Sequence, residues 1–203
     1  MRGGNSNADR RWLMDEIRKR HPALAEAMIE DAKVTAQHRG ERHRFRSRTD
    51  ALLQAARLMW ISDAFLAQTL YRVKARLQAA GIPVLPRLAH RLAMAIAQVS
   101  IGDPVVVHPG VYIIHGQVVI DGLVEIHPGV AIGPFVTIGL RRGDIVGPTI
   151  QRNAIIGTGA KVLGRVTIGA RAQVGANSLV LEDVEPGATV LGVPARAAGT
   201  ERR

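Results

Sequence analysis

Three histidines in the second half of the chain, His108, His115 and His127, are the residues best suited to acid–base chemistry near neutral pH. His108 and His127 each stand in the sequence HPG, which favours a corner of the chain, and we interpret both as structural. His115 lies outside that motif. The chain has no cysteine, which excludes disulfides and thiolate metal sites and removes the commonest covalent acyl carrier side chain. Its chemistry therefore points to a histidine rather than to a thiol.

A six-residue repeat follows Gly102 and must position these histidines. Isoleucine or valine recurs every sixth residue in two runs, which are Ile114, Ile120, Ile126, Ile132 and Ile138, then Ile150, Ile156, Val162, Ile168, Val174 and Val180. An aliphatic followed by small or turn-forming residues at this period is typical of a hexapeptide β-helix, in which three hexapeptides form one triangular coil. The repeat predicts a left-handed parallel β-helix of about four or five coils over residues 101–203.

Two irregularities interrupt the repeat. The register slips by one residue between the set that ends at Val107 and Ile113 and the set that begins at Ile114. The interval from Ile138 to Ile150 contains the polar segment GLRRGDIVGPT, which we expect to form a loop outside the coil.

The first hundred residues have the pattern of α-helices. Apolar residues recur at helical spacing, at Leu52, Ala55, Met59, Phe65, Leu66, Leu70, Val73 and Leu77. Pro83 and Pro86 break the pattern before a last helix from about Leu88 to Ala97. The predicted fold class is therefore α+β, with an α-helical domain over residues 1–100 followed by the β-helix domain and its C-terminal tail.

The net charge of +10 comes mainly from the helical half. Its most basic segment, Gln37 to Arg48, has no interleaved aromatics and no recognised nucleic-acid motif, so we interpret it as a solvated surface and expect no nucleic-acid partner. No apolar run is long enough to span a bilayer, and charges at the start leave no room for a signal peptide. These features predict a cytoplasmic protein without a membrane partner.

The segment from Ile155 to Arg196, IIGTGAKVLGRVTIGARAQVGANSLVLEDVEPGATVLGVPAR, resembles the closing coils of serine acetyltransferases and of their sugar O-acetyltransferase relatives. The resemblance covers residues 48–199. It implies a homotrimer or dimer of trimers with acetyl-CoA, the co-substrate, bound between neighbouring prisms, and no metal. The residues that fall at the family's coenzyme contacts are Gly139, Thr158, Gly159, Ala160, Lys161, Ala176 and Arg196. Taken singly, the small residues among them also fit coil corners.

The same alignment puts His115 at the family's catalytic histidine, the general base for an attacking hydroxyl. The alternative is a buried, hydrogen-bonded histidine. The family's aspartate that orients this histidine falls on Ser100, and the aspartate before it falls on Ile114. A serine hydroxyl can fix the imidazole tautomer but stabilises the imidazolium poorly. The carboxylates that could take over this role are Asp103, Asp121 and Glu125.

The acceptor pocket departs further from the family. The arginine and histidine that hold the carboxylate of serine fall on Val146 and Gly147, so we expect an altered pocket and poor use of L-serine. Arg141 or Arg142 in the loop could replace the missing charge. Asp50, in RSRTDALL, is the candidate for the acceptor-binding aspartate.

The resemblance thus implies an O-acetyltransferase that moves acetyl from acetyl-CoA to a hydroxyl of a small acceptor. Three other functions remain open. A sugar or polysaccharide-precursor O-acetyltransferase fits the loss of carboxylate-binding residues. A zinc enzyme of the carbonic anhydrase type would need converging histidines, but the spacing of His108, His115 and His127 differs from that family. An inactive trimeric scaffold would explain Ser100 and Ile114. The ending GTERR lacks the isoleucine-terminated tail by which serine acetyltransferases dock on a sulfhydrylase, so that complex is not expected.

Overall fold

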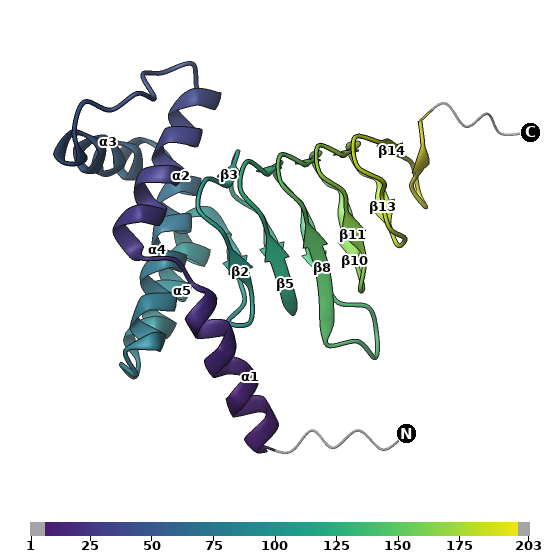
Figure 1. The fold of residues 1–203 in the computed structure, drawn as a ribbon, viewed down its shortest axis with the longest axis horizontal. Helices are drawn as coiled ribbons and strands as arrows, with labels where there is room; N and C mark the ends of the chain where they lie inside the picture. Colours follow the sequence, from purple (N-terminus) through teal and green to yellow (C-terminus); the bar gives the residue numbers. More distant parts are fainter. Residues whose placement is uncertain (1–6, 199–203) are drawn as a thin grey trace, which may run out of the picture.

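The computed structural model describes residues 7–198, as a group of helices from which a β-helix extends (Figure 1). The helices are α1 (Asn7–Arg20), α2 (Leu24–His38), α3 (Arg48–Ile61), α4 (Asp63–Ala79) and α5 (Leu85–Ala97). Ser47 and Ser62 cap α3 and α4, because each hydroxyl accepts a hydrogen bond from the backbone N–H three residues later. None of the described helices is long and apolar enough to cross a membrane.

Three parallel sheets form the sides of the β-helix. The first contains β1 (Ser100–Ile101), β4 (Val119–Ile120), β7 (Thr137–Gly139), β10 (Lys161–Leu163) and β13 (Leu179–Val180). The second contains β2 (Val106–Val107), β5 (Leu123–Ile126), β8 (Val146–Ile150) and β11 (Thr167–Ile168). The third contains β3 (Tyr112–Ile113), β6 (Ala131–Ile132), β9 (Ile155–Ile156), β12 (Gln173–Val174) and β14 (Thr189–Leu191), with β15 (Arg196–Ala197) antiparallel to β14. The prediction of helices followed by a left-handed parallel β-helix is confirmed.

The register slip lies later than the sequence predicted. Ile113, which is 3% exposed, points into the core, whereas Ile114 is 36% exposed and does not. The next inward residue is Ile120, so the extra residue of this coil falls at the corner that contains His115 and Gln117. The predicted inward position of Ile114 is therefore wrong, because both neighbours are isoleucines and the spacing alone cannot choose between them.

The predicted loop outside the coil is confirmed for residues 140–145, whereas the rest of the predicted segment belongs to β7 and β8. Ile138 and Ile150 are both fully buried in the core, and the chain between β7 and β8 leaves the prism as a protruding loop (Figure 1). Arg141 and Arg142 lie on this loop and are exposed.

One face of α4 covers the first coil of the β-helix with polar side chains. The hydrogen bonds run from Gln68 Nε2 to the Val111 carbonyl oxygen (3.0 Å), from Tyr71 Oη to that of Val105 (2.8 Å) and from Lys74 Nζ to that of Ile101 (2.6 Å). The first coil has no preceding coil to contact, and buried carbonyl groups without partners are costly. The side chains of α4 satisfy these carbonyls and fix the helices on the β-helix.

A buried ion pair strengthens this junction. Arg72 on α4 donates from Nε to Asp31 Oδ2 of α2 at 3.0 Å, and both side chains are 3% exposed. Arg72 also donates to the carbonyl oxygens of Val107 and His108. Asp31 accepts a further hydrogen bond from the Gly110 amide at 2.8 Å. Burial raises the pKa of Asp31, and the charge and hydrogen bonds of Arg72 oppose that shift. The pair therefore links α2, α4 and the first coil.

The last helix begins earlier than predicted. It starts at Leu85 rather than at about Leu88, and Pro86 lies in its first turn. Proline is tolerated there because the first N–H groups of a helix have no intrahelical acceptor.

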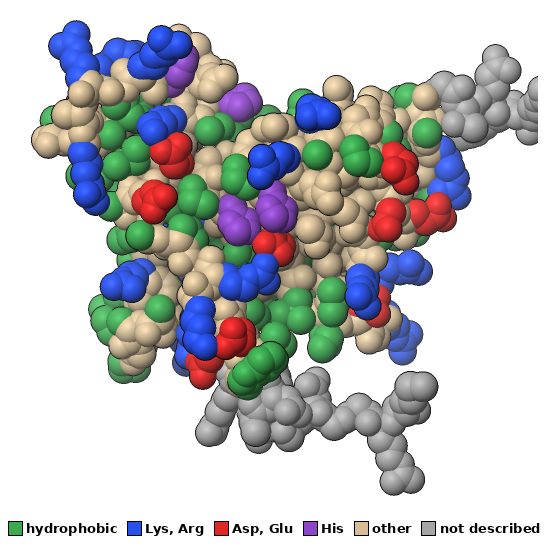
Figure 2. All heavy atoms as spheres, in the orientation of Figure 1, with side chains coloured by type: hydrophobic (Ala, Val, Ile, Leu, Met, Phe, Trp, Pro, Cys, Tyr) green, Lys and Arg blue, Asp and Glu red, His purple; other side chains and the backbone are tan. Residues whose placement is uncertain are grey.

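The basic segment between α2 and α3 forms a mostly exposed connection without helix or strand. Its charges are partly paired: Arg39 and Arg57 both contact Glu41, and Arg42 contacts Asp50. On the face shown in Figure 2, lysine and arginine side chains are dispersed over the whole molecule. This distribution agrees with the interpretation of a solvated surface.

Candidate functional site

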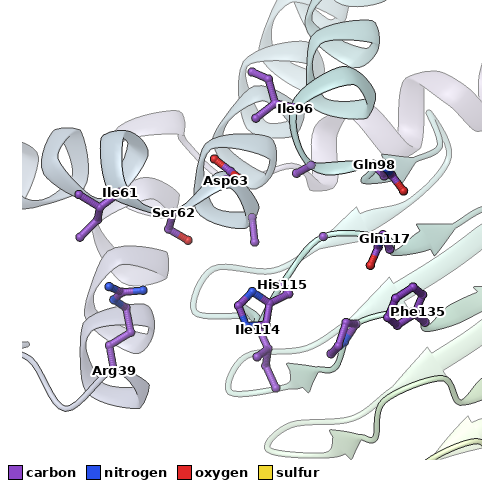
Figure 3. Close-up of a pocket in the computed structure, with 14 residues that line it drawn as sticks. Arg39, Ile61, Ser62, Asp63, Ile96, Gln98, Ile114, His115, Gln117 and Phe135 are labelled. Atoms are coloured by element: carbon purple, nitrogen blue, oxygen red, sulfur yellow. The ribbon is translucent and has the colours of Figure 1, made fainter.

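A cavity of about 590 Å³ lies where the helices meet the first coils of the β-helix (Figure 3). It is lined by Arg39, Ile61, Ser62, Asp63, Ala64, Ile96, Ala97, Gln98, Ile114, His115, Gly116, Gln117, Pro134 and Phe135. His115 is thus the candidate residue that this cavity contains. The size suits a small acceptor, since ligand pockets typically measure about 300–1,000 Å³.

The corner that holds His115 is fixed by the end of α5. The Gln117 amide donates to the carbonyl oxygen of Ala97 at 2.8 Å. A Cβ atom on Gly116 would lie 1.9 Å from the same oxygen, so only glycine allows this approach. Gln117 has a positive φ of 62°, which turns the chain into β4. In a single chain, His115 is exposed to the cavity.

Two charged residues that the sequence did not indicate also line the cavity. Asp63 is the first residue of α4, directly after its cap Ser62, and supplies the carboxylate of the lining. Arg39 follows the end of α2, and its Nε donates to Glu41 Oε1 at 2.8 Å. The serine cap predicts where α4 starts, but no local signal predicts that this end faces His115.

The predicted partners of the base lie elsewhere in the described structure. Asp103 binds Lys74 Nζ at 3.0 Å, and Asp121 lines a second cavity between α1 and the coils. Glu125 lies on β5 of the second sheet, whereas His115 follows β3 of the third sheet. Ser100, on β1, donates its amide to the carbonyl oxygen of Val118. None of these four lines the cavity of His115.

The corner of His115 continues along the β-helix as a column. Ile113, Ile132, Ile156 and Val174 are paired in successive coils, so the residues two positions later, His115, Pro134, Thr158 and Ala176, follow one another along the prism. Thr158 and Ala176 are exposed. Two of the predicted coenzyme contacts therefore lie in line with the candidate base.

Three other predicted coenzyme residues, Gly159, Ala160 and Lys161, follow Thr158 in the sequence. Gly159 has a φ of +73° and leaves no room for a Cβ beside Asn177, so it serves the corner. Ala160 is fully buried, and its amide and carbonyl are both used by neighbouring backbone, which contradicts a side-chain contact with a ligand. Lys161 Nζ donates to the Phe135 carbonyl oxygen at 2.6 Å. We therefore remove Ala160 from the groove wall.

Gly139 and Arg196 lie at separate places on the prism. Gly139 is buried at the end of β7, where its carbonyl oxygen accepts from the Gly164 amide. Arg196 is exposed on β15 and contacts Glu182 at 3.8 Å. The ending used to predict the absence of a sulfhydrylase complex, residues 199–203, lies outside the described residues.

The residues assigned to the acceptor are not brought to this cavity within one chain. Arg42 donates two hydrogen bonds of 2.9 Å to Asp50 and holds its pKa at about 2. Val146 begins β8, and Gly147 is buried against Val124. None of Asp50, Val146 and Gly147 is among the lining residues.

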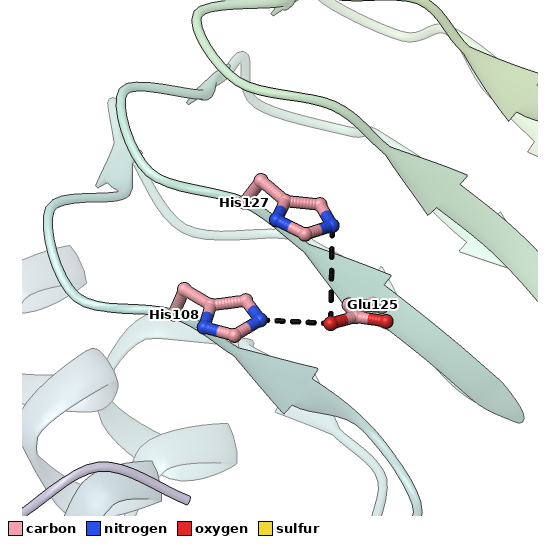
Figure 4. Close-up of side chains that lie close together, drawn as sticks. All are labelled: His108, Glu125 and His127. Atoms are coloured by element: carbon pink, nitrogen blue, oxygen red, sulfur yellow. Dashed lines mark hydrogen bonds and ion pairs between the residues drawn. The ribbon is translucent and has the colours of Figure 1, made fainter. Parts of the chain in front are cut away.

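A second cluster contains the two remaining histidines of the β-helix (Figure 4). His108 Nε2 lies 2.8 Å and His127 Nε2 lies 3.8 Å from Glu125 Oε1, which also pairs with Arg20 of α1. The two rings are stacked within 14° of parallel, and one ligand atom from each of His108, Glu125 and His127 lies within 4.8 Å of the others, a spacing that could hold a metal ion. Burial lowers the pKa of His127. The cluster therefore links α1 with two coil corners through Glu125.

Comparison with known proteins relates the chain to one family. The model of the bacterial transferase hexapeptide (six repeats) matches residues 147–182. The serine acetyltransferase of Synechococcus elongatus is 34% identical over 146 residues, which cover 65% of this chain and 55% of that protein. That of Helicobacter pylori strain J99 is 32% identical over 136 residues, which cover 65% of this chain and 79% of that protein. The chain thus spans little more than half the length of the cyanobacterial relative.

A solved structure agrees with these relatives. A serine acetyltransferase in complex with CoA matches with a TM-score of 0.71 at 26% sequence identity, covering 93% of this chain and 75% of that one. The match therefore includes the helices as well as the β-helix.

Proposed function

Because this chain belongs to the serine acetyltransferase family, we propose that it is an enzyme that transfers the acetyl group of acetyl-CoA to a hydroxyl group of a small acceptor. The observation that carries the proposal is His115, which is exposed in a cavity of about 590 Å³ at the head of the column that continues through Thr158 and Ala176. An acceptor in the cavity and a thioester along the column would meet at this histidine.

The proposed reaction needs a general base. An alcohol is a poor nucleophile at neutral pH, so His115 takes the hydroxyl proton as the oxygen attacks the thioester carbon. The new C–O bond forms, the C–S bond breaks, and the histidine returns the proton to the sulfur of CoA. No covalent enzyme intermediate is required, which suits a chain without cysteine.

The proposed acetyl-CoA site is the exposed part of the predicted groove. Thr158 and Ala176 present small side chains to the groove. Gly157 packs closely on the next coil, since a Cβ atom on Gly157 would lie 2.8 Å from the amide nitrogen of Ala176. A thin pantetheine arm can therefore lie against the wall. Lys161 and Arg196 offer positive charge for the phosphates further along the prism.

We propose L-serine as the acceptor. The names of the relatives support this choice, and the comparisons lend no support to the altered pocket that Val146 and Gly147 predicted. A sugar acceptor, which the sequence analysis left open, is an alternative outcome of the assay. A thioester-release assay with L-serine and neutral sugars at saturating acetyl-CoA tests the choice. We expect CoA release with serine, whereas release with sugars alone contradicts it, and an inactive scaffold releases none.

We expect a trimer or a dimer of trimers in solution. The proposed groove has one wall on each of two neighbouring prisms, and apolar side chains near it, Phe135, Ile155 and Leu191, are 54%, 46% and 50% exposed in a single chain. Sedimentation equilibrium measures the mass directly. A stable monomer with full acetyl transfer contradicts a shared site.

A further inference from the structure

We propose that Arg39 and Asp63 hold the two charged groups of the acceptor, with the guanidinium on the carboxylate and the Asp63 carboxylate on the ammonium. This inference rests on the proposed function, since it names what the cavity of His115 binds.

The charges of the cavity lining are opposite to those of an amino acid, because a cation can pair with its carboxylate and a carboxylate with its ammonium. Arg39 supplies its cation and Asp63 its carboxylate, while Ile61, Ile96 and Phe135 are apolar. The side chains come from separate elements: Arg39 from the end of α2, Asp63 from the start of α4 and His115 from the first coils (Figure 3). A zwitterion with one hydroxyl offers one partner to each of the three.

Arg39 retains the donors that this role needs. Within the described residues, Arg39 donates a hydrogen bond from Nε to Glu41 Oε1, and this contact orients the planar group. The two terminal nitrogens make no hydrogen bond to the described part of the chain, so they can bind a carboxylate in a bidentate manner. Glu41 also pairs with Arg57 at 2.6 Å, so its negative charge is shared and does not cancel that of Arg39.

Asp63 is fixed by the start of α4. Its backbone follows the cap Ser62, whose Oγ accepts from the Phe65 amide at 3.3 Å, and the adjoining Ala64 and Phe65 are buried. The carboxylate itself is on an exposed residue that lines the cavity. A rigid backbone with an accessible charged end is the arrangement that positions a ligand group with little entropy cost.

The test measures equilibrium binding of three acceptors in the presence of CoA, so it does not depend on turnover. L-serine carries both charges, ethanolamine lacks the carboxylate, and 3-hydroxypropanoate lacks the ammonium. The variants are Arg39→Met and Asp63→Asn. Their matched controls are Arg57→Met, which removes the other partner of Glu41, and Asp15→Asn, an exposed aspartate on α1 that lies outside the cavity.

We expect a crossed pattern. Arg39→Met weakens binding of L-serine and 3-hydroxypropanoate by about 10- to 100-fold and leaves ethanolamine unchanged, because a charge-assisted hydrogen bond has roughly that value. Asp63→Asn weakens L-serine and ethanolamine to a similar extent and leaves 3-hydroxypropanoate unchanged. Both controls bind all three as the parent protein does.

Three results would overturn the inference. Equal losses for all three ligands indicate a structural effect, unchanged L-serine binding shows that neither residue holds it, and no L-serine binding to the parent protein removes the site. Acetyl transfer is measured separately. A crossed binding pattern without transfer therefore contradicts the proposed function and leaves the charged pair standing, whereas transfer without the pattern does the reverse.

Discussion

Replacing His115 by alanine is expected to lower the rate of acetyl transfer by at least about 10²-fold, because the variant lacks the base that accepts the hydroxyl proton. Acetyl-CoA affinity should change little, since this residue contacts the acceptor end of the site. Steady-state kinetics at saturating acetyl-CoA give the rate, and calorimetric titration with CoA gives the affinity.

His127→Ala is the matched control. His127 is also a partly exposed histidine at a coil corner, but it contacts Glu125 and stacks on His108 in the second cluster. We expect a much smaller loss of rate in this variant. Equal losses in both variants would assign the histidines a structural role and remove His115 as the base.

The variant Arg72→Met is expected to lower the free energy of unfolding by about 3–5 kcal/mol, the usual cost of leaving one partner of a buried ion pair alone. It leaves Asp31 buried without its partner and removes the donor to the carbonyl oxygens of Val107 and His108. Urea denaturation followed by circular dichroism measures the loss.

Arg76→Met provides the control for this prediction. Arg76 is an exposed arginine one turn later on the same helix, so its loss should change the stability little. A double variant, Asp31→Leu with Arg72→Met, should recover part of the stability because no charge remains buried. A loss below about 1 kcal/mol in Arg72→Met would show that the ion pair does not hold the junction.

This junction matters for the site as well as for stability. Asp63 begins the same helix that carries Gln68, Tyr71, Arg72 and Lys74, and these side chains fix α4 on the first coil. The helices form one wall of the cavity and the first coils of the β-helix form the other. The polar face of α4 therefore sets where the helices meet the coil that carries His115.

The fold was predictable because its signal is periodic. Each inward aliphatic from Ile120 to Val180 repeats the same local environment, so many residues support one conclusion. The polar face of α4 was not predictable in the same way. Its apolar residues Leu66 and Leu70 suggested a core face, whereas the fully covered side chains include Gln68 and Arg72, whose partners lie in the distant first coil.

The candidate site was predictable only in part, for a geometric reason. Asp121 and Glu125 are near His115 in the sequence, but a three-sided coil sends successive hexapeptides to different faces, so sequence proximity does not give contact. Arg39 and Asp63 come from the ends of two helices, and only their packing on the first coil brings them to the cavity. His115 was identified because a family alignment, not a local pattern, indicated it.

The most direct test of acetyl transfer to serine is the identity of the product. Wild-type protein is incubated with L-serine and acetyl-CoA labelled with carbon-13 in the acetyl group, and the products are analysed by mass spectrometry beside those of His115→Ala. We expect labelled O-acetyl-L-serine from the wild type and almost none from the variant. Label that stays on CoA, or that reaches serine equally well without His115, would contradict it.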